Sequence, residues 1–225
     1  MVKKLILIIV LIFSFHSIVK ANESVEIQID VVQRILSLID TKKNEILKQY
    51  YVGLGMNSFK TPIGKFLVIE KSKNPGWINP YNKAETIKPG ENSPLGTRWI
   101  TFHKDSATNI EFGIHGTYNY PSVGKYSSHG CVRMYIEDIE ELFDLIEIDT
   151  PVLVFYERLK IDLLEDNNIA LAIYKDPYNL EPLTLSKVKE KILKKYPLAI
   201  INEDAIKVML SIKTKEYRLV GYIEN

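Results

Sequence analysis

The sequence predicts a mainly β fold with one amphipathic helix after its only cysteine and a small α+β extension at the C-terminus. Residues 25–29 alternate apolar and polar side chains, as a strand with one buried face does. Residues 136–146 instead repeat apolar side chains at helical spacing, with acidic residues between them. Short apolar runs elsewhere are separated by glycine, proline and asparagine, which is typical of strands joined by turns.

The first part of the chain, up to residue 157, is predicted to be built mostly of strands. A turn at residues 40–44 joins the second strand to the third, which suggests a hairpin meander. Residues 71–96 hold four prolines, and a long irregular segment of this kind inside a domain is often functional. Whether it closes over a ligand is left open. The strands predicted after the first are 34–39, 46–52, 65–70, 99–102, 111–114 and 151–156.

The tail, residues 158–225, carries fewer signals, and its role is left open. Ser186 is predicted to cap a short helix that stops at Pro197. The tail could be a separate domain or a collar on the first one. The strands predicted in it are 160–164, 169–174, 208–212 and 218–223.

The N-terminus has the three-part pattern of a secretory signal peptide. Lys3 and Lys4 precede the apolar run 5–13, and small residues at Val19 and Ala21 suit cleavage after Ala21. The apolar stretch is short for a membrane span of roughly 20 residues. We therefore expect an exported protein of the periplasm or cell envelope, without a stable membrane anchor after cleavage.

The predicted organisation is a signal peptide at 1–21, a first domain at 22–157 and an extension at 158–225. Cleavage removes three lysines and no acids, so the formal charge moves from +1 to −2. This balance gives no reason to expect nucleic-acid binding.

Cys131 stands in the polar, glycine-rich stretch 127–131. A lone cysteine is most often buried and inert, but this stretch is too polar for a core strand. A thiol needs a base to become a nucleophile, and His115 and His129 are both candidates. Neighbouring glycines let backbone N–H groups approach a substrate, as an oxyanion hole requires. The pattern indicates a cysteine-nucleophile enzyme that transfers acyl groups.

Five motifs occur in a specific order along the chain: Thr61-Pro62-Ile63-Gly64-Lys65-Phe66, Pro75-Gly76-Trp77, Ser93-Pro94-Leu95-Gly96-Thr97-Arg98-Trp99, Gly113-Ile114-His115-Gly116-Thr117 and Ser128-His129-Gly130-Cys131-Val132-Arg133-Met134. With them the chain resembles the L,D-transpeptidase catalytic domain family, bacterial cell-wall cross-linking enzymes that use cysteine, over about residues 25–157. The resemblance implies a β-sandwich of that family's type. The tail motif Asp176-Pro177-Tyr178 is similar to the branch found in Gram-negative envelopes.

Two departures from the family accompany the resemblance. Many relatives carry an asparagine shortly after the arginine, where this chain reads Tyr135-Ile136-Glu137-Asp138, so the capping of the following helix is expected to differ. The peptidoglycan-binding repeat that often precedes the domain has no counterpart. Wall affinity is then expected from the catalytic cleft or from the tail.

The resemblance implies roles for the residues of the last two motifs. Cys131 matches the nucleophile, and His115 matches the histidine that takes its proton. The backbone N–H groups of His129 and Gly130, with that of Cys131, would form the oxyanion hole. The carbonyl of Gly116 would orient the base.

A substrate-binding group is also implied. Arg133 is expected to bind a substrate carboxylate, because a guanidinium can do so in a bidentate way. Arg98 with Trp99 could shape the cleft or serve the structure, and Tyr120 and Tyr126 could line the cleft or pack in a loop. The predicted substrate-binding residues are Arg133, Arg98, Ser128 and Tyr118.

The implied reaction is acyl transfer in two steps on peptidoglycan stem peptides. Cys131 would attack a tetrapeptide stem, release D-alanine and form a thioester, which an amine of a second stem would attack. No cofactor or nucleotide is expected, because the thioester conserves the energy of the donor bond. Water as acceptor would give a carboxypeptidase, and a protein amine would anchor an envelope lipoprotein. The family also implies a part in cell-wall biogenesis and cell shape, and acylation by carbapenems.

Two other classes stay open. A metallopeptidase could bind zinc through His115, His129 and Cys131, but no His-Glu-x-x-His helix occurs and the last two lie too close together for a typical ligand pair. No metal is therefore expected. A non-catalytic peptidoglycan-binding protein could retain the fold, although the presence of both His115 and Cys131 argues against it.

Overall fold

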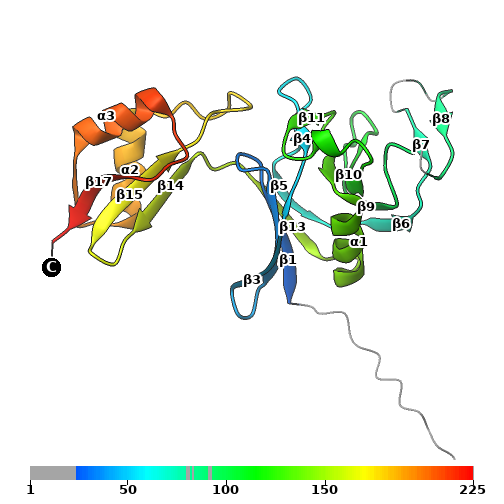
Figure 1. Cartoon of the computed structure of the whole chain (residues 1–225), viewed down its shortest axis with the longest axis horizontal. Coiled ribbons are helices and arrows are strands. Elements are labelled where there is room, and N and C mark those ends of the chain that lie inside the picture. The colour runs from blue at the N-terminus through cyan, green and yellow to red at the C-terminus, as the bar shows by residue number, and fades with distance from the viewer. Residues whose placement is uncertain (1–23, 80–81, 83, 91–92, 225) are drawn as a thin grey trace, which may run out of the picture.

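The computed structural model describes residues 24–79, 82, 84–90 and 93–224 of the 225-residue chain. The predicted signal peptide at 1–21 lies outside them. The described residues form two lobes, which we call the N-terminal lobe and the C-terminal lobe (Figure 1). Among these residues, no helix is both long and apolar enough to cross a membrane.

The N-terminal lobe is built around a five-stranded and a four-stranded sheet, with strand orders β3-β2-β1-β13-β5 and β12-β10-β9-β6. Two short pairs, β11-β4 and β7-β8, accompany them. Its elements are β1 (Val25–Asp30), β2 (Ile35–Asp40), β3 (Glu45–Tyr51), β4 (Leu54–Gly55), β5 (Gly64–Leu67), β6 (Glu70–Lys73), β7 (Trp77–Ile78), β8 (Thr86–Ile87), β9 (Arg98–Lys104), β10 (Glu111–Gly116), the 3-10 helix η1 (Tyr120–Ser122), β11 (Tyr126–Ser128), β12 (Val132–Met134), α1 (Ile136–Leu145) and β13 (Pro151–Phe155).

One hydrophobic core joins both sheets of this lobe. Ile27 and Ile29 of β1 are completely buried, as the alternation in the sequence predicts. They share a cluster with Ile114 of the four-stranded sheet and with Ile139 and Leu142 of α1. The apolar stripe of α1 therefore packs against the sheet that carries β10. The prediction of a mainly β fold with a helix after the cysteine is confirmed.

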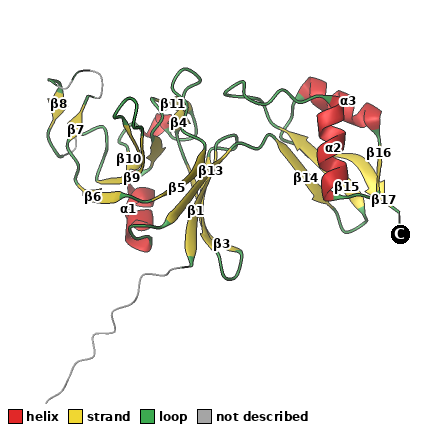
Figure 2. Cartoon of the chain, turned by 180° about the vertical axis from the view of Figure 1, so that it is seen from behind, coloured by secondary structure: helices red, strands yellow, loops and turns green. Residues whose placement is uncertain are grey.

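The C-terminal lobe is a four-stranded antiparallel sheet, β14-β15-β17-β16, with two helices packed on it (Figure 2). Thr184 caps α2 in place of the predicted cap Ser186, because the Thr184 hydroxyl accepts a hydrogen bond from Lys187 N. The elements of this lobe are β14 (Leu159–Leu163), β15 (Asn168–Ile173), α2 (Leu185–Lys195), β16 (Ala199–Ile201), α3 (Glu203–Ile212) and β17 (Arg218–Ile223).

The strand predicted at 208–212 is wrong, because these residues form the second half of α3. The Asn202 side chain accepts a hydrogen bond from Ala205 N and caps this helix. Ile206 and Met209, three residues apart, are buried in the core of the C-terminal lobe, whereas Val208 is exposed. The helical period thus decides the structure, although the apolar run alone favours a strand.

Tyr178 belongs to the predicted extension but packs in the core of the N-terminal lobe, where it is 1% exposed. Its hydroxyl donates to the Gly55 carbonyl at 2.9 Å and accepts from Thr61 N at 3.2 Å. Its ring stacks on Tyr156. The segment after β15 is therefore part of the structure that supports the N-terminal lobe. The domain boundaries themselves stay a prediction.

Tyr178→Phe is expected to lower the free energy of unfolding by about 1–3 kcal/mol, because the buried Thr61 N–H and Gly55 carbonyl lose their shared partner. Tyr178→Ala is expected to cost about 3–5 kcal/mol, since it also leaves a cavity. Urea denaturation of a chain that starts at residue 22 measures both. The control is Tyr222→Phe, at an exposed position, with an expected change within about 0.5 kcal/mol. Equal stability of Tyr178→Phe and the unaltered chain would contradict the bridging role.

Candidate active site

Strand pairing brings the candidate residues onto one face of the sheet β12-β10-β9-β6. His115 of β10 pairs with Trp99 of β9 on one side and with Arg133 of β12 on the other. Side chains of paired residues point to the same face, so these three form a row across the sheet. Cys131 lies just before β12, and it lines the same cleft as Trp99, the residue that pairs with His115. The predicted nucleophile and base therefore share a surface.

His115 is held in an orientation that suits a base. Its side chain is buried, and Nδ1 lies 2.7 Å from the carbonyl oxygen of Gly116. A carbonyl only accepts hydrogen bonds, so Nδ1 carries the proton and Nε2 has a free lone pair. Burial lowers the pKa of His115 from 6.5 to about 4, against the opposing effect of the Gly116 hydrogen bond. The imidazole is therefore neutral at neutral pH.

The carbonyl that orients His115 is itself fixed by packing. Gly96, whose φ is +63°, lies against Gly116, and a side-chain carbon at Gly96 would come 2.9 Å from the Gly116 oxygen. A side-chain carbon at Gly116 would meet Ile136 and Ile139 of α1 at 2.9 and 3.0 Å. The glycines of the third and fourth motifs thus let the chain pack closely behind the histidine.

Cys131 is partly buried, and its thiol lies 3.9 Å from the carbonyl oxygen of Glu111. Burial raises the pKa of the Cys131 thiol, while the Gly113 backbone N–H and the Arg133 charge act in the opposite direction. With a thiol pKa above its ordinary value and an imidazole pKa of about 4, the resting pair is a neutral thiol and a neutral imidazole. Proton transfer from the thiol to the imidazole is therefore expected to accompany attack on a substrate.

The loop before Cys131 is braced by Ser128, which is 2% exposed. Its hydroxyl donates to the Cys131 carbonyl at 2.6 Å and accepts from Gly130 N at 3.1 Å. A side chain used in this way inside the loop is not available to a ligand, so the predicted substrate contact of Ser128 is replaced by a bracing role. The Gly130 N–H, predicted to serve in the oxyanion hole, points at Ser128 in this structure.

Gly130 itself has a φ of +113°, which only glycine adopts readily. A side-chain carbon there would lie 2.5 Å from the ring of Phe112 and 3.2 Å from the Lys60 carbonyl. The loop that carries Cys131 therefore packs closely against the segments that contain Phe112 and Lys60.

Gly130→Ala is expected to lower the rate of Cys131 acylation by at least about 100-fold, since a shift of about 1 Å at a reacting group can cost that much. The measurement is the rate of adduct formation by intact-protein mass spectrometry. The control is Gly90→Ala, because Gly90 also has a positive φ but would meet no atom within 4 Å of an added side-chain carbon and lies outside the candidate site. An unchanged rate in Gly130→Ala would show that the loop tolerates the displacement.

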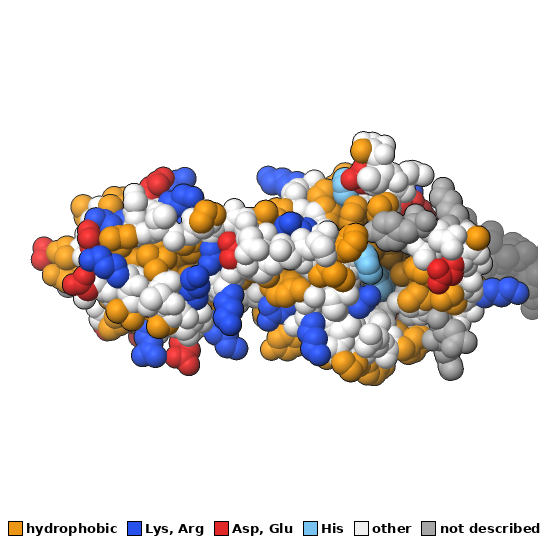
Figure 3. All heavy atoms as spheres, turned by 90° about the horizontal axis from the view of Figure 1, so that it is seen from above, with side chains coloured by type: hydrophobic (Ala, Val, Ile, Leu, Met, Phe, Trp, Pro, Cys, Tyr) orange, Lys and Arg blue, Asp and Glu red, His pale blue; other side chains and the backbone are white. Residues whose placement is uncertain are grey.

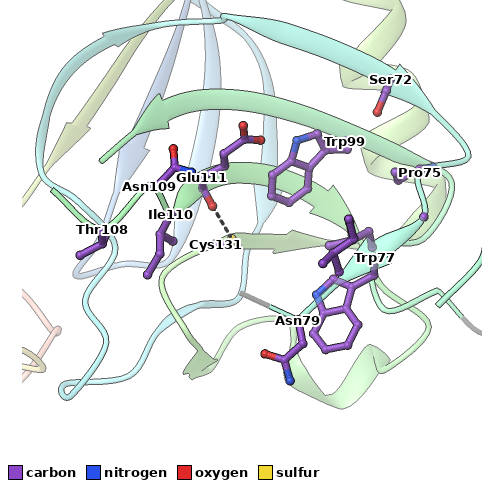
Figure 4. Close-up of a pocket in the computed structure, with 13 residues that line it drawn as sticks. Ser72, Pro75, Trp77, Asn79, Trp99, Thr108, Asn109, Ile110, Glu111 and Cys131 are labelled. Carbon is purple, nitrogen blue, oxygen red and sulfur yellow. Dashed lines mark hydrogen bonds between the residues drawn. The ribbon is translucent and has the colours of Figure 1, made fainter. Parts of the chain in front are cut away.

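Cys131 opens into a cleft of about 570 Å³ (Figure 4). Residues 75–79 and Trp99 form one side of it, so that two indole side chains, Trp77 and Trp99, line the cleft. Residues 108–111 form the opposite side. The described part of the irregular segment 71–96 therefore contributes a wall of the cleft, in keeping with the functional role expected of so long a segment.

The wall at 108–111 was not predicted from the sequence. The signal available for it is the turn that leads into β10. The Asp105 carboxylate accepts hydrogen bonds from the backbone N–H groups of Ala107 and Thr108, and Asn109 has a φ of +56°. Asp and Asn at these positions are typical of such turns. The turn places the carbonyl of Glu111 beside the thiol.

Arg133 is partly buried on the same face as His115, and among the described residues no carboxylate pairs with it. Its backbone N–H and carbonyl both bond to Gly53, at 2.8 Å each, which fixes the position of the side chain. Burial lowers the pKa of Arg133, although the guanidinium stays charged. A half-buried cation without an acidic partner suits an anionic ligand.

The other predicted contacts lie elsewhere. Arg98 points to the face opposite Trp99, where it pairs with Glu140 at 3.3 Å and covers Phe143 of α1, so its role is structural. The hydroxyl of Tyr126 accepts from Arg34 on the side away from the cleft. Tyr118 is exposed and, like Tyr120, lies outside the residues that line the cleft.

His129 is exposed and packs its ring on Phe59, with 4.6 Å between the ring centroids. The imidazole of His115 is instead buried and engaged at Nδ1. Within the described residues, no group of three His, Cys, Asp or Glu side chains is arranged to hold a metal ion. The geometry therefore supports His115 as the partner of the thiol.

The fold and the site define a mainly β protein that places a partly buried cysteine and a buried, neutral histidine on one sheet face. The chain belongs to the L,D-transpeptidase catalytic domain family (YkuD), whose model matches residues 24–154. The resemblance deduced from the motifs is confirmed.

Relatives come from both Bacillus and Escherichia. The Bacillus subtilis protein YqjB, which is named as an L,D-transpeptidase, is 38% identical over 112 residues, covering 49% of this chain and 61% of that protein. Escherichia coli ErfK/SrfK, also so named, is 25% identical over 158 residues, covering 66% of this chain and 48% of that protein. The chain thus spans only about half to three fifths of these relatives. The similarity to the Gram-negative branch stays a prediction.

Among solved structures, the catalytic domain of an L,D-transpeptidase from Enterococcus faecium matches with a TM-score of 0.46 and 24% identity. The match covers 59% of this chain and 98% of that domain.

Proposed function

We propose that this protein is a peptidoglycan L,D-transpeptidase that forms a thioester between Cys131 and a tetrapeptide stem. The observation that carries the proposal is the arrangement of a cleft-facing thiol and a neutral histidine, with a free lone pair, on one sheet face. Membership of the L,D-transpeptidase family supports it. The site is predicted to work in the periplasm or cell envelope.

In the first step, the Cys131 sulfur attacks the carbonyl that precedes the terminal D-alanine of the donor stem. His115 accepts the thiol proton at Nε2 during the attack and delivers it to the departing amine of D-alanine. The negative oxygen of the tetrahedral intermediate is expected to bind backbone N–H groups of residues 129–131. For the Gly130 N–H to take part, it must exchange Ser128 for the substrate.

In the second step, the amine of another stem attacks the thioester. His115 takes a proton from this amine, and Cys131 leaves as a thiol. The reaction breaks one amide and makes one amide, so it needs no cofactor. Water in place of the amine would give an L,D-carboxypeptidase, and a protein amine would link an envelope lipoprotein to the wall.

The test is to incubate the mature chain with a disaccharide-tetrapeptide and separately with a carbapenem, then to analyse protein and products by mass spectrometry. A covalent adduct together with cross-linked dimer is the expected result. Shortened monomer without dimer would instead identify a carboxypeptidase or a missing acceptor. No adduct with either compound would overturn the proposal and favour a non-catalytic wall-binding protein.

Arg133→Ala is expected to weaken use of the tetrapeptide donor by about 10- to 200-fold in kcat/KM, because a charged hydrogen bond of about 1.5–3 kcal/mol is lost. The readout is release of D-alanine at several donor concentrations. Arg133→Lys should recover part of the loss, since it keeps the charge but not the bidentate geometry. Unchanged kinetics in Arg133→Ala would remove the carboxylate-binding role.

A further inference from the structure

A second cleft, of about 700 Å³, lies where the two lobes meet, and the proposed reaction does not use it. Residues 32–35 at the β1–β2 turn, with Tyr51 and Tyr126, line it from the N-terminal lobe. Residues 174–177 and the loop after α3 line it from the other side. We call it the inter-lobe cleft.

The charge of the inter-lobe cleft is strongly positive. Lys175, Lys213 and Lys215 are exposed at its edge, and among the described residues none of them pairs with a carboxylate. The one acid in the lining, Asp176, is already bound by Arg158 at 3.2 Å and by backbone N–H groups. Its charge is therefore compensated within the protein.

The loop that carries two of these cations is tied to the sheet of the C-terminal lobe. Ile173 N donates to the Thr214 carbonyl at 3.0 Å, which ties the loop that carries Lys213 and Lys215 to strand β15. Figure 3 shows Lys and Arg side chains on both sides of the boundary between the lobes. The lysines thus converge on the cleft from a fixed loop rather than from a free terminus.

Arg34 supplies a fourth cation from the opposite wall. Its backbone has a φ of +59°, and its guanidinium donates to the Tyr126 hydroxyl at 2.9 Å while lying 4.9 Å from the centre of that ring. The backbone conformation is uncommon for a residue with a large side chain. The contacts with Tyr126 thus hold the guanidinium against the wall of the cleft.

Aromatic rings complete the lining. Tyr51 is 68% exposed, an unusual state for so large a ring, and it lies in the same lining as Tyr126 and Tyr174. The Tyr174 hydroxyl donates to the Gln33 side chain at 3.2 Å, which joins the two walls. Amphipathic rings beside fixed cations can contact the flat faces of sugars while the cations bind carboxylates.

We propose that the inter-lobe cleft binds a peptidoglycan strand, with its lysines on stem-peptide carboxylates and its tyrosines on the sugars. This inference rests on the proposed function. Tyr126 precedes Cys131 by five residues, so their Cα atoms are at most about 18 Å apart and one polymer can reach both clefts. Lysines bind phosphates as well as carboxylates, so the feature that favours a glycan strand over a phosphate polymer is the set of tyrosine rings in the lining.

The test is co-sedimentation of the mature chain with purified sacculi that have been freed of covalently attached phosphate polymers. The variant changes Lys175, Lys213 and Lys215 to Glu. The matched control changes Lys42, Lys43 and Lys194 to Glu, which alters the charge equally at exposed positions outside both clefts. We expect the apparent Kd for sacculi to rise at least 10-fold in the cleft variant and less than twofold in the control.

Equal binding by the cleft variant and the control, whether both are strong or both are weakened, would overturn the inference. The inference would also be overturned if the lysine variant bound a soluble polyphosphate or anionic vesicles more weakly than the unaltered chain does, but bound sacculi equally well. Carbapenem acylation of the unaltered chain is measured in parallel by mass spectrometry. Its absence would overturn the proposed function whatever the lysines do, whereas its presence with unchanged sacculus binding would overturn the inference alone.

Discussion

Cys131→Ala is expected to abolish covalent adducts with both the tetrapeptide and the carbapenem, and to lower turnover by at least about 1,000-fold. The change removes the only thiol of the chain, and with it the sole cysteine sulfur that opens into the cleft. When a nucleophile and a base act together, removing either one loses nearly all of the rate enhancement that the pair provides. Intact-protein mass spectrometry and D-alanine release measure the two losses.

The Cys131→Ala chain should remain folded, because the side chain is only partly buried and the loop is held by Ser128. Its urea midpoint should lie close to that of the unaltered chain. Cys131→Ser offers a second comparison, because it replaces the thiol with a hydroxyl of similar shape that is a much weaker nucleophile. Turnover by a folded Cys131→Ala chain would refute the thioester mechanism.

His115→Gln is expected to slow acylation of Cys131 by about 100- to 10,000-fold at pH 7, the usual contribution of a general base. The pH dependence carries a second signature. With a pKa of about 4, the base is deprotonated throughout the neutral range, so acylation should lose its His115 dependence only below about pH 4. An exposed histidine would instead give this acid limb near pH 6.5.

The same pKa predicts how stability varies with pH. Between pH 6.5 and about 4 the unfolded chain binds a proton at His115 that the folded chain excludes, so stability falls as the pH is lowered through this window. The shift corresponds to roughly 3 kcal/mol. His115→Gln should lack this part of the pH dependence, whereas His129→Gln, at an exposed position, should retain it. An identical pH dependence in His115→Gln and the unaltered chain would contradict the burial argument.

The sequence predicted the strands with a clear period of two, such as β1, because alternation alone decides which side chains are buried. It failed at α3, where the run from Val208 to Ile212 favours a strand. The deciding interactions are the Asn202 cap and the burial of Ile206 with Met209, and burial depends on where the sheet of the C-terminal lobe lies.

For the candidate site, the motifs led directly to Cys131 and His115, because a thiol and a base are rare residue types in a distinctive setting. They could not separate Arg98 from Trp99, since adjacent strand residues face opposite sides and only the register with β10 shows which side holds the site. They also could not reveal that Ser128 turns inward to brace its own loop. Such assignments depend on tertiary contacts between distant segments.

The raised pKa of the Cys131 thiol has a consequence for how long the proposed nucleophile survives in an oxidising environment. Peroxides attack thiolates, and oxidation then proceeds through sulfenic to irreversible sulfinic and sulfonic acids. A thiol whose pKa is raised by burial offers little thiolate to such oxidants between turnovers. The chain has no second cysteine that could rescue a sulfenic acid as an internal disulfide, so a thiol that stays protonated is expected to limit this damage.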